Sequence, residues 1–195
     1  HAALHSIDPQ PLIRTLQEQG IDDSGYSLNS PFDWLKEKAC TLPWIRESVH
    51  WLIDYRPPEP GHLAVCHGDF HPLNILVEDG AVTGVLDWPG FAITDPAFDV
   101  ANTLVLTTIP AKHLAVSWKG FSSVDWDAFA EEYVSAYRAH RHLDSTNVAY
   151  YKVRRCVAAL IEGVDGQKVW QHPLIVNDLI GYIYHITGIQ ITIPA

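Results

Sequence analysis

The sequence comprises 195 residues, of which 47% are hydrophobic and 18% are charged. A chain of this length can bury roughly 70% of its unfolded surface, so disorder of the whole is excluded and one domain or two small lobes are expected. With 13 Lys and Arg against 23 Asp and Glu, the formal net charge is −10. That balance argues against a nucleic-acid-binding protein and leaves cationic small molecules open as ligands.

Helices separated by turns are expected over residues 1–61. Asp8 before a proline is a typical helix start, and apolar residues at helical spacing follow it up to Gly20. A second helix is predicted from Ser30, and a third over residues 42–55. The proline-rich run that follows ends helix formation, because proline lacks the backbone N–H and fixes φ.

The pattern then changes to short strands. Residues 63–66 form an apolar run. Two runs rich in β-branched residues, 74–77 and 81–86, flank the turn pair Asp79-Gly80. We therefore expect a strand followed by a β-hairpin.

Helical spacing returns after Asp95 and its following proline and continues through most of the remaining chain. Further helices are predicted over residues 125–140, 147–164 and 176–186. Asp95 itself is expected to cap the helix that begins at the proline. The sequence thus predicts a mostly helical α+β fold with one small β element.

Three cysteines, Cys40, Cys66 and Cys156, are odd in number and lack C-x-x-C spacing. They are interpreted as buried thiols of a reduced compartment. No signal peptide opens the chain, and the uncharged stretch 179–195 holds too many polar residues for a membrane span, so a cytoplasmic protein is expected. The chain has no Met and begins at His1; either its start was removed or it is a piece of a longer protein.

The densest group of potentially reactive side chains lies between the first strand and the hairpin, and includes His67, Asp69 and His71. Asn74 opens the hairpin and Asp87 follows its second strand. Because a hairpin returns its second strand to the start of the first, Asp87 should lie close to Asn74. Their carboxylate and amide oxygens, with Asp69 one loop away, suit Mg²⁺.

The spacing of these residues is typical of phosphoryl transfer. Asp69 and Asn74 fit the D-x-x-x-x-N catalytic loop of protein kinases, with His67 at the first position of H-x-D. Asp87 stands at the place of the metal-binding Asp that follows the hairpin. Such a reaction needs a carboxylate to orient the attacking hydroxyl and metal ligands to neutralise the phosphates.

Three segments of the chain carry a family resemblance. They are His67-Gly68-Asp69-Phe70-His71-Pro72-Leu73-Asn74-Ile75-Leu76, Val85-Leu86-Asp87-Trp88 and Asp95-Pro96-Ala97-Phe98-Asp99-Val100-Ala101. Together they resemble the aminoglycoside phosphotransferase family, which is similar to choline, fructosamine, macrolide and homoserine kinases and shares the protein-kinase-like fold. The resemblance implies an ATP- and Mg²⁺-dependent enzyme that transfers the γ-phosphate to a hydroxyl of a small molecule.

The resemblance also implies a role for each motif residue. Asp69 would be the catalytic base. Asn74 and Asp87 would hold Mg²⁺. His67 would orient the catalytic loop, and Asp99 would be the structural acid that anchors it.

The nucleotide side of the resemblance is less complete. Leu76 and Leu86 would form the floor under the adenine of ATP. Three positions depart from the family pattern: Pro89 replaces an acidic residue, Thr94 a glycine before Asp-Pro, and Leu73 a glycine before Asn. The proline argues against a second metal contact.

No glycine-rich loop, strand lysine or partner glutamate precedes the catalytic loop, so the resemblance covers a C-terminal lobe only. Its parts would be a helical segment after the hinge (1–61), the catalytic loop, hairpin and metal site (62–101), and a helical substrate-binding part (102–195). Without the N-terminal ATP-binding lobe, these residues should bind ATP weakly and be inactive alone. The exposed interlobe face should also be prone to association.

Two other functions stay open. His67, Asp69 and His71 alternate along the chain, so in an extended strand they would share a face and could chelate Zn²⁺ or Mn²⁺ in a metallohydrolase. That hypothesis leaves Asn74 and Asp87 unexplained; under the kinase hypothesis His71 only packs or hydrogen-bonds beside the loop. The third hypothesis is a non-catalytic, kinase-like binding scaffold.

Substrate-binding residues are not identified by the sequence. Four acids, Asp125, Asp127, Glu131 and Glu132, open a helix, where they suit the helix macrodipole and a solvated face. They also remain candidates for binding a cationic substrate. No nucleic acid or membrane partner is expected, and the oligomeric state stays open.

Overall fold

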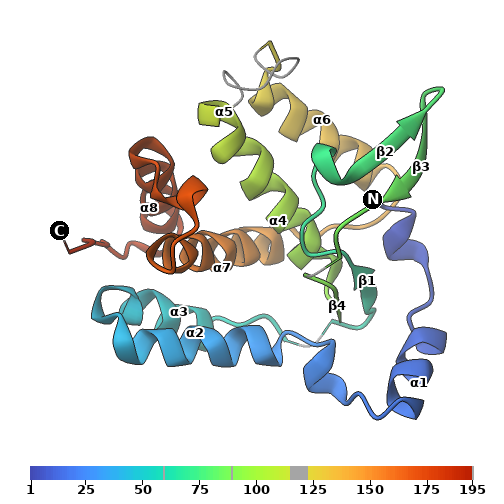
Figure 1. Ribbon diagram of the computed structural model, residues 1–195, viewed down its shortest axis with the longest axis horizontal. Coiled ribbons are helices and arrows are strands. Elements are labelled where there is room, and N and C mark those ends of the chain that lie inside the picture. The colour runs from blue at the N-terminus through green and yellow to red at the C-terminus, as the bar shows by residue number, and fades with distance from the viewer. Residues whose placement is uncertain (59, 89, 115–122, 195) are drawn as a thin grey trace.

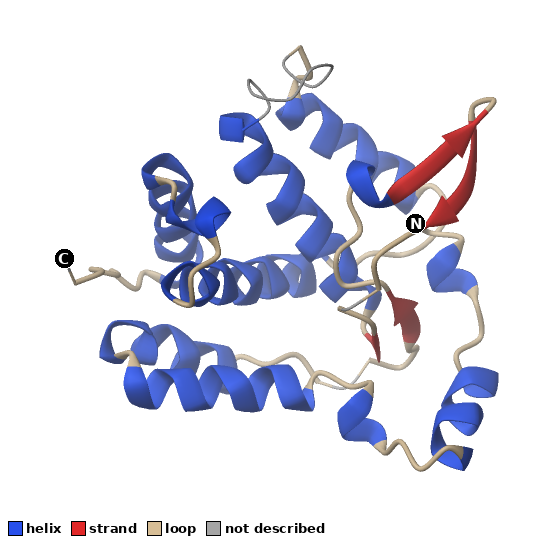
Figure 2. Cartoon of the chain, in the orientation of Figure 1, coloured by secondary structure: helices blue, strands red, loops and turns tan. Residues whose placement is uncertain are grey.

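The computed structural model describes residues 1–58, 60–88, 90–114 and 123–194, and most of these are helical (Figures 1 and 2). The α-helices are α1 (Gln10–Glu18), α2 (Asn29–Thr41), α3 (Arg46–Asp54), α4 (Pro96–Thr108), α5 (Pro110–Leu114), α6 (Trp126–Arg138), α7 (Ser145–Val164) and α8 (Pro173–Thr187). The strands are β1 (Ala64–Cys66), β2 (Ile75–Glu78), β3 (Ala81–Val85) and β4 (Ala92–Thr94). Short 3-10 turns include η1 (Leu4–Ser6), η3 (Pro43–Ile45), η4 (Pro72–Asn74) and η6 (Lys168–Gln171).

Helices α4 and α7 pack against each other at the centre of the molecule. Helix α8 and turn η6 cover α7 on one side, while α3, paired with α2, contacts it on another (Figure 1). Nearly all of α4 from Ala97 to Val105 is buried, which matches its mainly apolar sequence. The polar residues that α4 does carry therefore need partners inside the protein.

The strands form two separate antiparallel pairs. β1 pairs with β4, and Val65 faces Ile93 across that pair. β2 and β3 form the predicted hairpin, with a bulge after Leu76. At its tip Asp79 and Gly80 both have positive φ, the conformation that a two-residue hairpin turn of this type requires. Figure 2 shows this hairpin projecting from the helical body.

The predicted fold class, a mostly helical α+β lobe with one small hairpin, is confirmed. The helix predicted over residues 42–55 is divided into η3 and α3. Strand β4 and helix α5 are short elements that the sequence pattern does not predict. Asp95 is confirmed as the N-cap of α4, since its side chain accepts a hydrogen bond from the backbone N–H of Ala97.

The prediction that all three thiols are buried is wrong for Cys40. Cys66 and Cys156 are buried, but Cys40 is exposed. On α2 the preceding residue, Ala39, faces the core. One step along a helix turns the next side chain by about 100°, which directs Cys40 to solvent.

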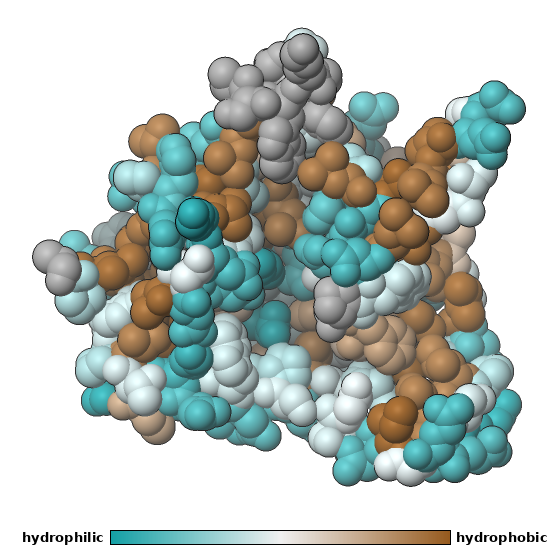
Figure 3. All heavy atoms as spheres, in the orientation of Figure 1, coloured by the Kyte–Doolittle hydropathy of each residue, from teal (hydrophilic) through white to brown (hydrophobic). Residues whose placement is uncertain are grey.

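The hairpin presents apolar side chains to solvent. Leu76, Val77, Val82 and Leu86 are between 47% and 64% exposed. Figure 3 shows apolar surface on the arm formed by β2 and β3. In the described part of the chain, no helix combines the length and apolar character needed to cross a bilayer.

Candidate active site

The loop that follows β1 holds the predicted catalytic base, Asp69, and its backbone is closely packed. Gly68 has a φ of +81°, and a Cβ there would lie 2.0 Å from the carbonyl oxygen of Gly90. Only glycine accepts both the conformation and the contact. The loop is therefore pressed against the segment that comes after Asp87, and the Asp69 side chain stays 36% exposed beside it.

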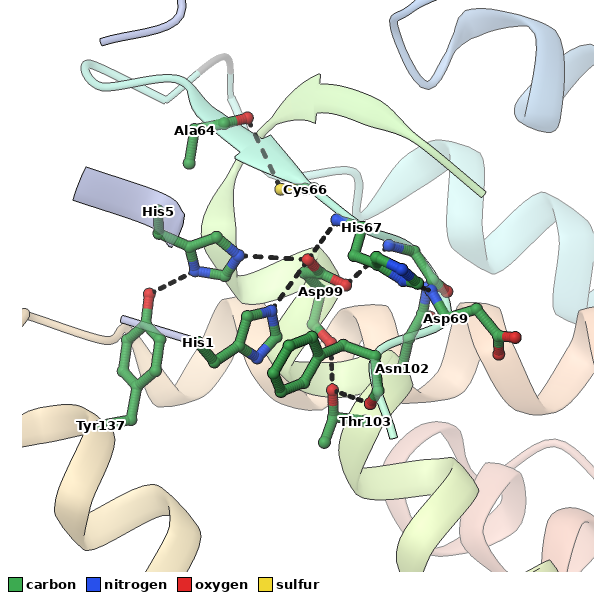
Figure 4. A network of polar contacts seen from close by, with 12 residues as sticks. His1, His5, Ala64, Cys66, His67, Asp69, Asp99, Asn102, Thr103 and Tyr137 are labelled. Atoms are coloured by element: carbon green, nitrogen blue, oxygen red, sulfur yellow. Dashed lines mark hydrogen bonds and ion pairs between the residues drawn. The ribbon is translucent and has the colours of Figure 1, made fainter. Parts of the chain in front are cut away.

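Asp99 anchors this loop from the first turn of α4 (Figure 4). Its carboxylate accepts hydrogen bonds from the backbone N–H groups of His67 and Gly68, the latter at 2.8 Å. The side chain is fully buried. These contacts tie the start of the loop to α4.

Two more residues of α4, Asn102 and Thr103, hold the carbonyl groups of the same loop. Asn102 Nδ2 donates to the oxygen of Gly68 at 2.9 Å, and Thr103 Oγ1 donates to that of Phe70 at 2.7 Å. Neither residue was predicted from the motifs. Their signal is positional, because they lie three and four residues after Asp99 and so share its helix face.

His67 joins the catalytic loop to the hairpin. Its Nδ1 accepts the backbone N–H of Asp69 at 3.2 Å, so the ring proton lies on Nε2, which donates to the carbonyl oxygen of Leu86 at 2.8 Å. The ring is fully buried. One imidazole thus fixes Asp69 relative to the residue that precedes Asp87.

Asn74 lies between Asp69 and the hairpin. Its Nδ2 donates to the carbonyl oxygen of Asp69 at 2.9 Å and lies 3.3 Å from Asp69 Oδ2. The backbone N–H of Leu86 donates to the carbonyl oxygen of Asn74 at 2.8 Å, which extends the hairpin ladder by one step. Asp87 is the next residue, exposed and with a φ of +62°.

Residues 74 and 87 offer a donor set that fits a hard divalent cation. Because the amide nitrogen of Asn74 is turned toward Asp69, its oxygen is the atom left for a metal, and Asp87 adds a carboxylate. Asp87 holds a backbone conformation that non-glycine residues rarely adopt, and such conformations concentrate at functional sites.

The electrostatics of the loop keep Asp69 ionised. The nearby imidazole of His71 holds the pKa of the Asp69 carboxyl below its ordinary value, while partial burial acts in the opposite direction. The positive charge of Arg155 contributes to the same lowering of the pKa. His71 Nε2 lies 3.5 Å from Asp69 Oδ2 and 3.3 Å from Asn74 Nδ2, so it stands beside the loop.

His67, Asp69 and His71 do not surround one metal position. Both ring nitrogens of His67 are engaged by backbone groups, which leaves neither for a metal. Leu76 and Leu86 lie open on the hairpin, 47% and 48% exposed. Pro89 lies outside the described residues.

A buried network that the motifs do not reveal lies behind Asp99 (Figure 4). His1 Nε2 and His5 Nε2 lie 2.9 and 3.1 Å from Asp99 Oδ2. Their Nδ1 atoms contact the hydroxyls of Tyr133 and Tyr137 at 2.6 and 2.7 Å. The available signal is spacing: the histidines are four residues apart, and the tyrosines are four residues apart on one face of α6.

Of the four acids considered for a cationic substrate, two have contacts within the protein and two are exposed. Asp125 caps α6 by accepting from the backbone N–H groups of residues 127 and 128. Asp127 forms an ion pair with Lys112, with 2.6 Å between oxygen and nitrogen. Glu131 and Glu132 are exposed on α6.

Sequence comparison identifies relatives of known class. The sequence model of the family described as "Phosphotransferase enzyme family" matches residues 1–146. An aminoglycoside 3'-phosphotransferase of Streptomyces fradiae is 31% identical over 115 residues, which cover 56% of this chain and 38% of that protein. The chain thus matches well under two thirds of that relative's length.

Two solved structures share the fold. A thermostable mutant of an aminoglycoside phosphotransferase, in a ternary complex with AMP-PNP and hygromycin B, has a TM-score of 0.52 at 21% identity and covers 75% of this chain and 45% of that chain. The macrolide 2'-phosphotransferase of Brachybacterium faecium has a TM-score of 0.51 at 21% identity and covers 93% and 57%.

Proposed function

The chain belongs to the phosphotransferase enzyme family, and on that premise we propose that it carries the acceptor-activating and metal-binding residues of a small-molecule kinase that uses ATP and Mg²⁺. The expected family and kinase-like fold are confirmed. One observation carries the proposal. The buried imidazole of His67 and the side-chain amide of Asn74 together hold Asp69 next to the end of the hairpin that leads to Asp87.

In this proposal Asp69 is the catalytic residue. It accepts a hydrogen bond from the acceptor hydroxyl and directs that oxygen toward the γ-phosphorus of ATP. The bond between the acceptor oxygen and this phosphorus forms, the bond from phosphorus to the β,γ-bridging oxygen breaks, and ADP leaves. The hydroxyl proton passes to Asp69, which its lowered pKa keeps ionised beforehand.

The remaining residues position the reacting groups. Asn74 and Asp87 would hold Mg²⁺ through oxygen atoms, and bound Mg²⁺ would neutralise charge on the phosphates. His67 and Asp99 act through the loop backbone, as positioning residues. The apolar, open surfaces of Leu76 and Leu86 suit the adenine ring.

We also propose the organisation expected from the motifs: a helical segment (1–61), the loop, hairpin and metal site (62–101), and a helical substrate-binding part (102–195). Contacts to the ATP phosphates would then come from outside these 195 residues. The free cysteines support a reducing, cytoplasmic compartment. Isothermal titration of ATP·Mg²⁺ into the 195-residue chain and into the product of the complete reading frame should give much weaker binding to the chain alone.

The function is tested by measuring ATP consumption and phosphate transfer to a panel of hydroxylated small molecules, with the product of the complete reading frame. Asp69→Asn should lower kcat about 10²–10⁴-fold, the usual contribution of a general base. Asp54→Asn, the same change at an exposed position of α3, should leave it unaltered. Full activity of Asp69→Asn would refute the catalytic role, and a lack of transfer to any acceptor would favour the binding scaffold.

A further inference from the structure

A cavity of about 170 Å³ opens directly beside the catalytic loop. The loop contributes His71, Pro72 and Leu73 to its wall, and α4 contributes Leu106. Thr107 of α4 also lines it, and the rest of the described wall comes from α5, the start of α6 and turn η6, which includes Trp170. The elements that converge here can be followed in Figure 1. His71, whose Nε2 lies 3.5 Å from Asp69 Oδ2, places this cavity beside the proposed base.

The wall of the cavity is apolar. Apart from two tryptophans, its described polar side chains are His71 and Thr107. His71 turns Nε2 toward Asp69 and Asn74, and Thr107 Oγ1 donates to the carbonyl oxygen of Thr103 at 2.7 Å. Both polar groups therefore have partners within the protein, and a ligand here would meet mainly carbon atoms.

No acidic side chain belongs to the described wall of this cavity. Two acids flank Trp126 of the wall: Asp125 caps α6, and Asp127 is paired with Lys112. Arg155 stacks its guanidinium 4.8 Å from the ring centre of Trp170, and both of its terminal nitrogens lie 3.0 Å from Glu162 oxygens. A polycationic ligand would find no carboxylate in this wall to replace its hydration.

We propose that the acceptor substrate is a neutral alcohol with a mainly apolar surface, and that a ring or branched alkyl group beside its reacting hydroxyl fills this cavity. The inference rests on the proposed function. A dry cavity of about 150 Å³ lined by aliphatic residues holds a benzene-sized molecule, which sets the size of the group. Because His71 both lines the cavity and lies 3.5 Å from Asp69, the apolar group and the reacting hydroxyl are one side chain apart.

Binding is measured without ATP, using the product of the complete reading frame. Trp126 and Trp170 line the cavity, so its occupation should change tryptophan fluorescence. The probes are 2-cyclohexylethanol, a neutral macrocyclic lactone and an aminoglycoside. The two neutral alcohols should bind at least tenfold more tightly than the aminoglycoside, in buffer of physiological ionic strength.

Two substitutions locate the binding. Ala111→Leu adds three carbon atoms to the cavity wall and should weaken binding of the neutral alcohols at least tenfold. Ala136→Leu, the same change at an exposed position of α6, should have no effect. Leu114→Ala enlarges the cavity without crowding the fold and should shift the preference toward the bulkier lactone.

The outcomes separate this inference from the proposed function. Tighter binding of the aminoglycoside, or neutral-alcohol binding that Ala111→Leu leaves unchanged, would overturn the inference even if phosphate is transferred. Absence of transfer to every acceptor would overturn the proposed function, and the fluorescence titration would still decide whether the cavity takes neutral alcohols.

Discussion

His67 shows how one side chain sets the geometry of the candidate site. Its two ring nitrogens bind the N–H of Asp69 and the carbonyl of Leu86, so the base and the hairpin end cannot move independently. A neutral imidazole suits this role, because it has one donor and one acceptor at opposite sides of a rigid ring. In the proposed function, the residues that touch the reactants are thus held by a residue that does not.

Asp87 allows a test of the metal site that leaves the backbone alone. Asn tolerates the left-handed conformation that Asp87 adopts, so Asp87→Asn should keep the melting temperature while removing the carboxylate charge. The concentration of Mg²⁺ needed for half-maximal activity should rise about 10–100-fold. It is measured by activity titration with Mg²⁺ and by thermal denaturation.

The matched control is Asp79→Asn. Asp79 has a φ of +51° at the hairpin tip and is exposed, so it undergoes the same chemical change in a similar conformation away from the site. Equal Mg²⁺ requirements for the two variants would contradict the metal role of Asp87.

The approach of His71 Nε2 to within 3.5 Å of Asp69 Oδ2 predicts a pH effect. It holds the pKa of Asp69 below its ordinary value, so His71→Ala should raise this pKa. The base must be ionised to act; the acid limb of the kcat/KM profile should therefore move to higher pH. The lowered pKa of Asp69 also adds to the free energy of unfolding at pH values above the ordinary pKa of Asp. This contribution is lost as the pH falls through the lowered pKa, and His71→Ala should lack the contribution.

The pH dependence of kcat/KM for the variant is compared with that of His62→Ala, an exposed histidine outside the loop. An acid limb that stays in place in His71→Ala would show that Asp69 does not depend on His71 for its ionisation.

At the scale of elements, the catalytic loop is defined by one glycine. Gly68→Ala combines a positive φ with a Cβ placed 2.0 Å from the Gly90 oxygen. It should reduce the free energy of unfolding by more than about 3 kcal/mol, since the contact adds to the strain. Gly80 has a φ of +77°, but a Cβ there would meet nothing within 4 Å. Gly80→Ala should therefore reduce the free energy of unfolding by only about 1–2 kcal/mol.

Urea denaturation of both variants separates conformational strain from the close contact. If Gly68→Ala and Gly80→Ala lose the same free energy of unfolding, the close approach of the loop to Gly90 does not affect stability. The loop would then be held by its hydrogen bonds to α4 and by those of His67 and Asn74.

The elements that could be predicted from the sequence carry local signals. The Asp79-Gly80 turn and the helical spacing of α4, α6 and α7 lie within short windows, and these elements form as expected. β4 has three residues and exists because it pairs with β1, almost thirty residues earlier, so no local pattern reports it. Motif spacing predicted that Asp69, Asn74 and Asp87 share one region, supported by His67 and Asp99. The additional support from Asn102 and Thr103 of α4 and from the histidines of the chain start carries no motif.

At the scale of the whole molecule, the first residues are tied to helices distant in the sequence. His5 joins Tyr137 of α6 to Asp99 of α4, and all three are buried. His5→Ala would leave two buried polar groups without this partner, each costing about 1–3 kcal/mol. The free energy of unfolding should fall by about 2–4 kcal/mol in urea denaturation.

Exposed His50 of α3 provides the comparison, and His50→Ala should be neutral. Hydrogen exchange of the His67 and Gly68 amides should accelerate in His5→Ala, because Asp99 accepts from both. Unchanged stability and exchange in His5→Ala would mean that Asp99 holds the loop without help from the chain start.

Helix α4 holds the catalytic loop through hydrogen bonds between the side chains of Asp99, Asn102 and Thr103 and the peptide groups of the loop. These peptide groups are the same whatever side chain a residue carries. Pro72 and Leu73, which are part of the cavity wall, take no part in these hydrogen bonds. With the acceptor in this cavity and Asp69 as the base, as proposed, selection can therefore exchange such wall residues, and with them the molecules accepted, while Asp69 stays in place. A laboratory library restricted to Leu73, Leu106 and Leu114 would sample new acceptors on an unchanged catalytic framework.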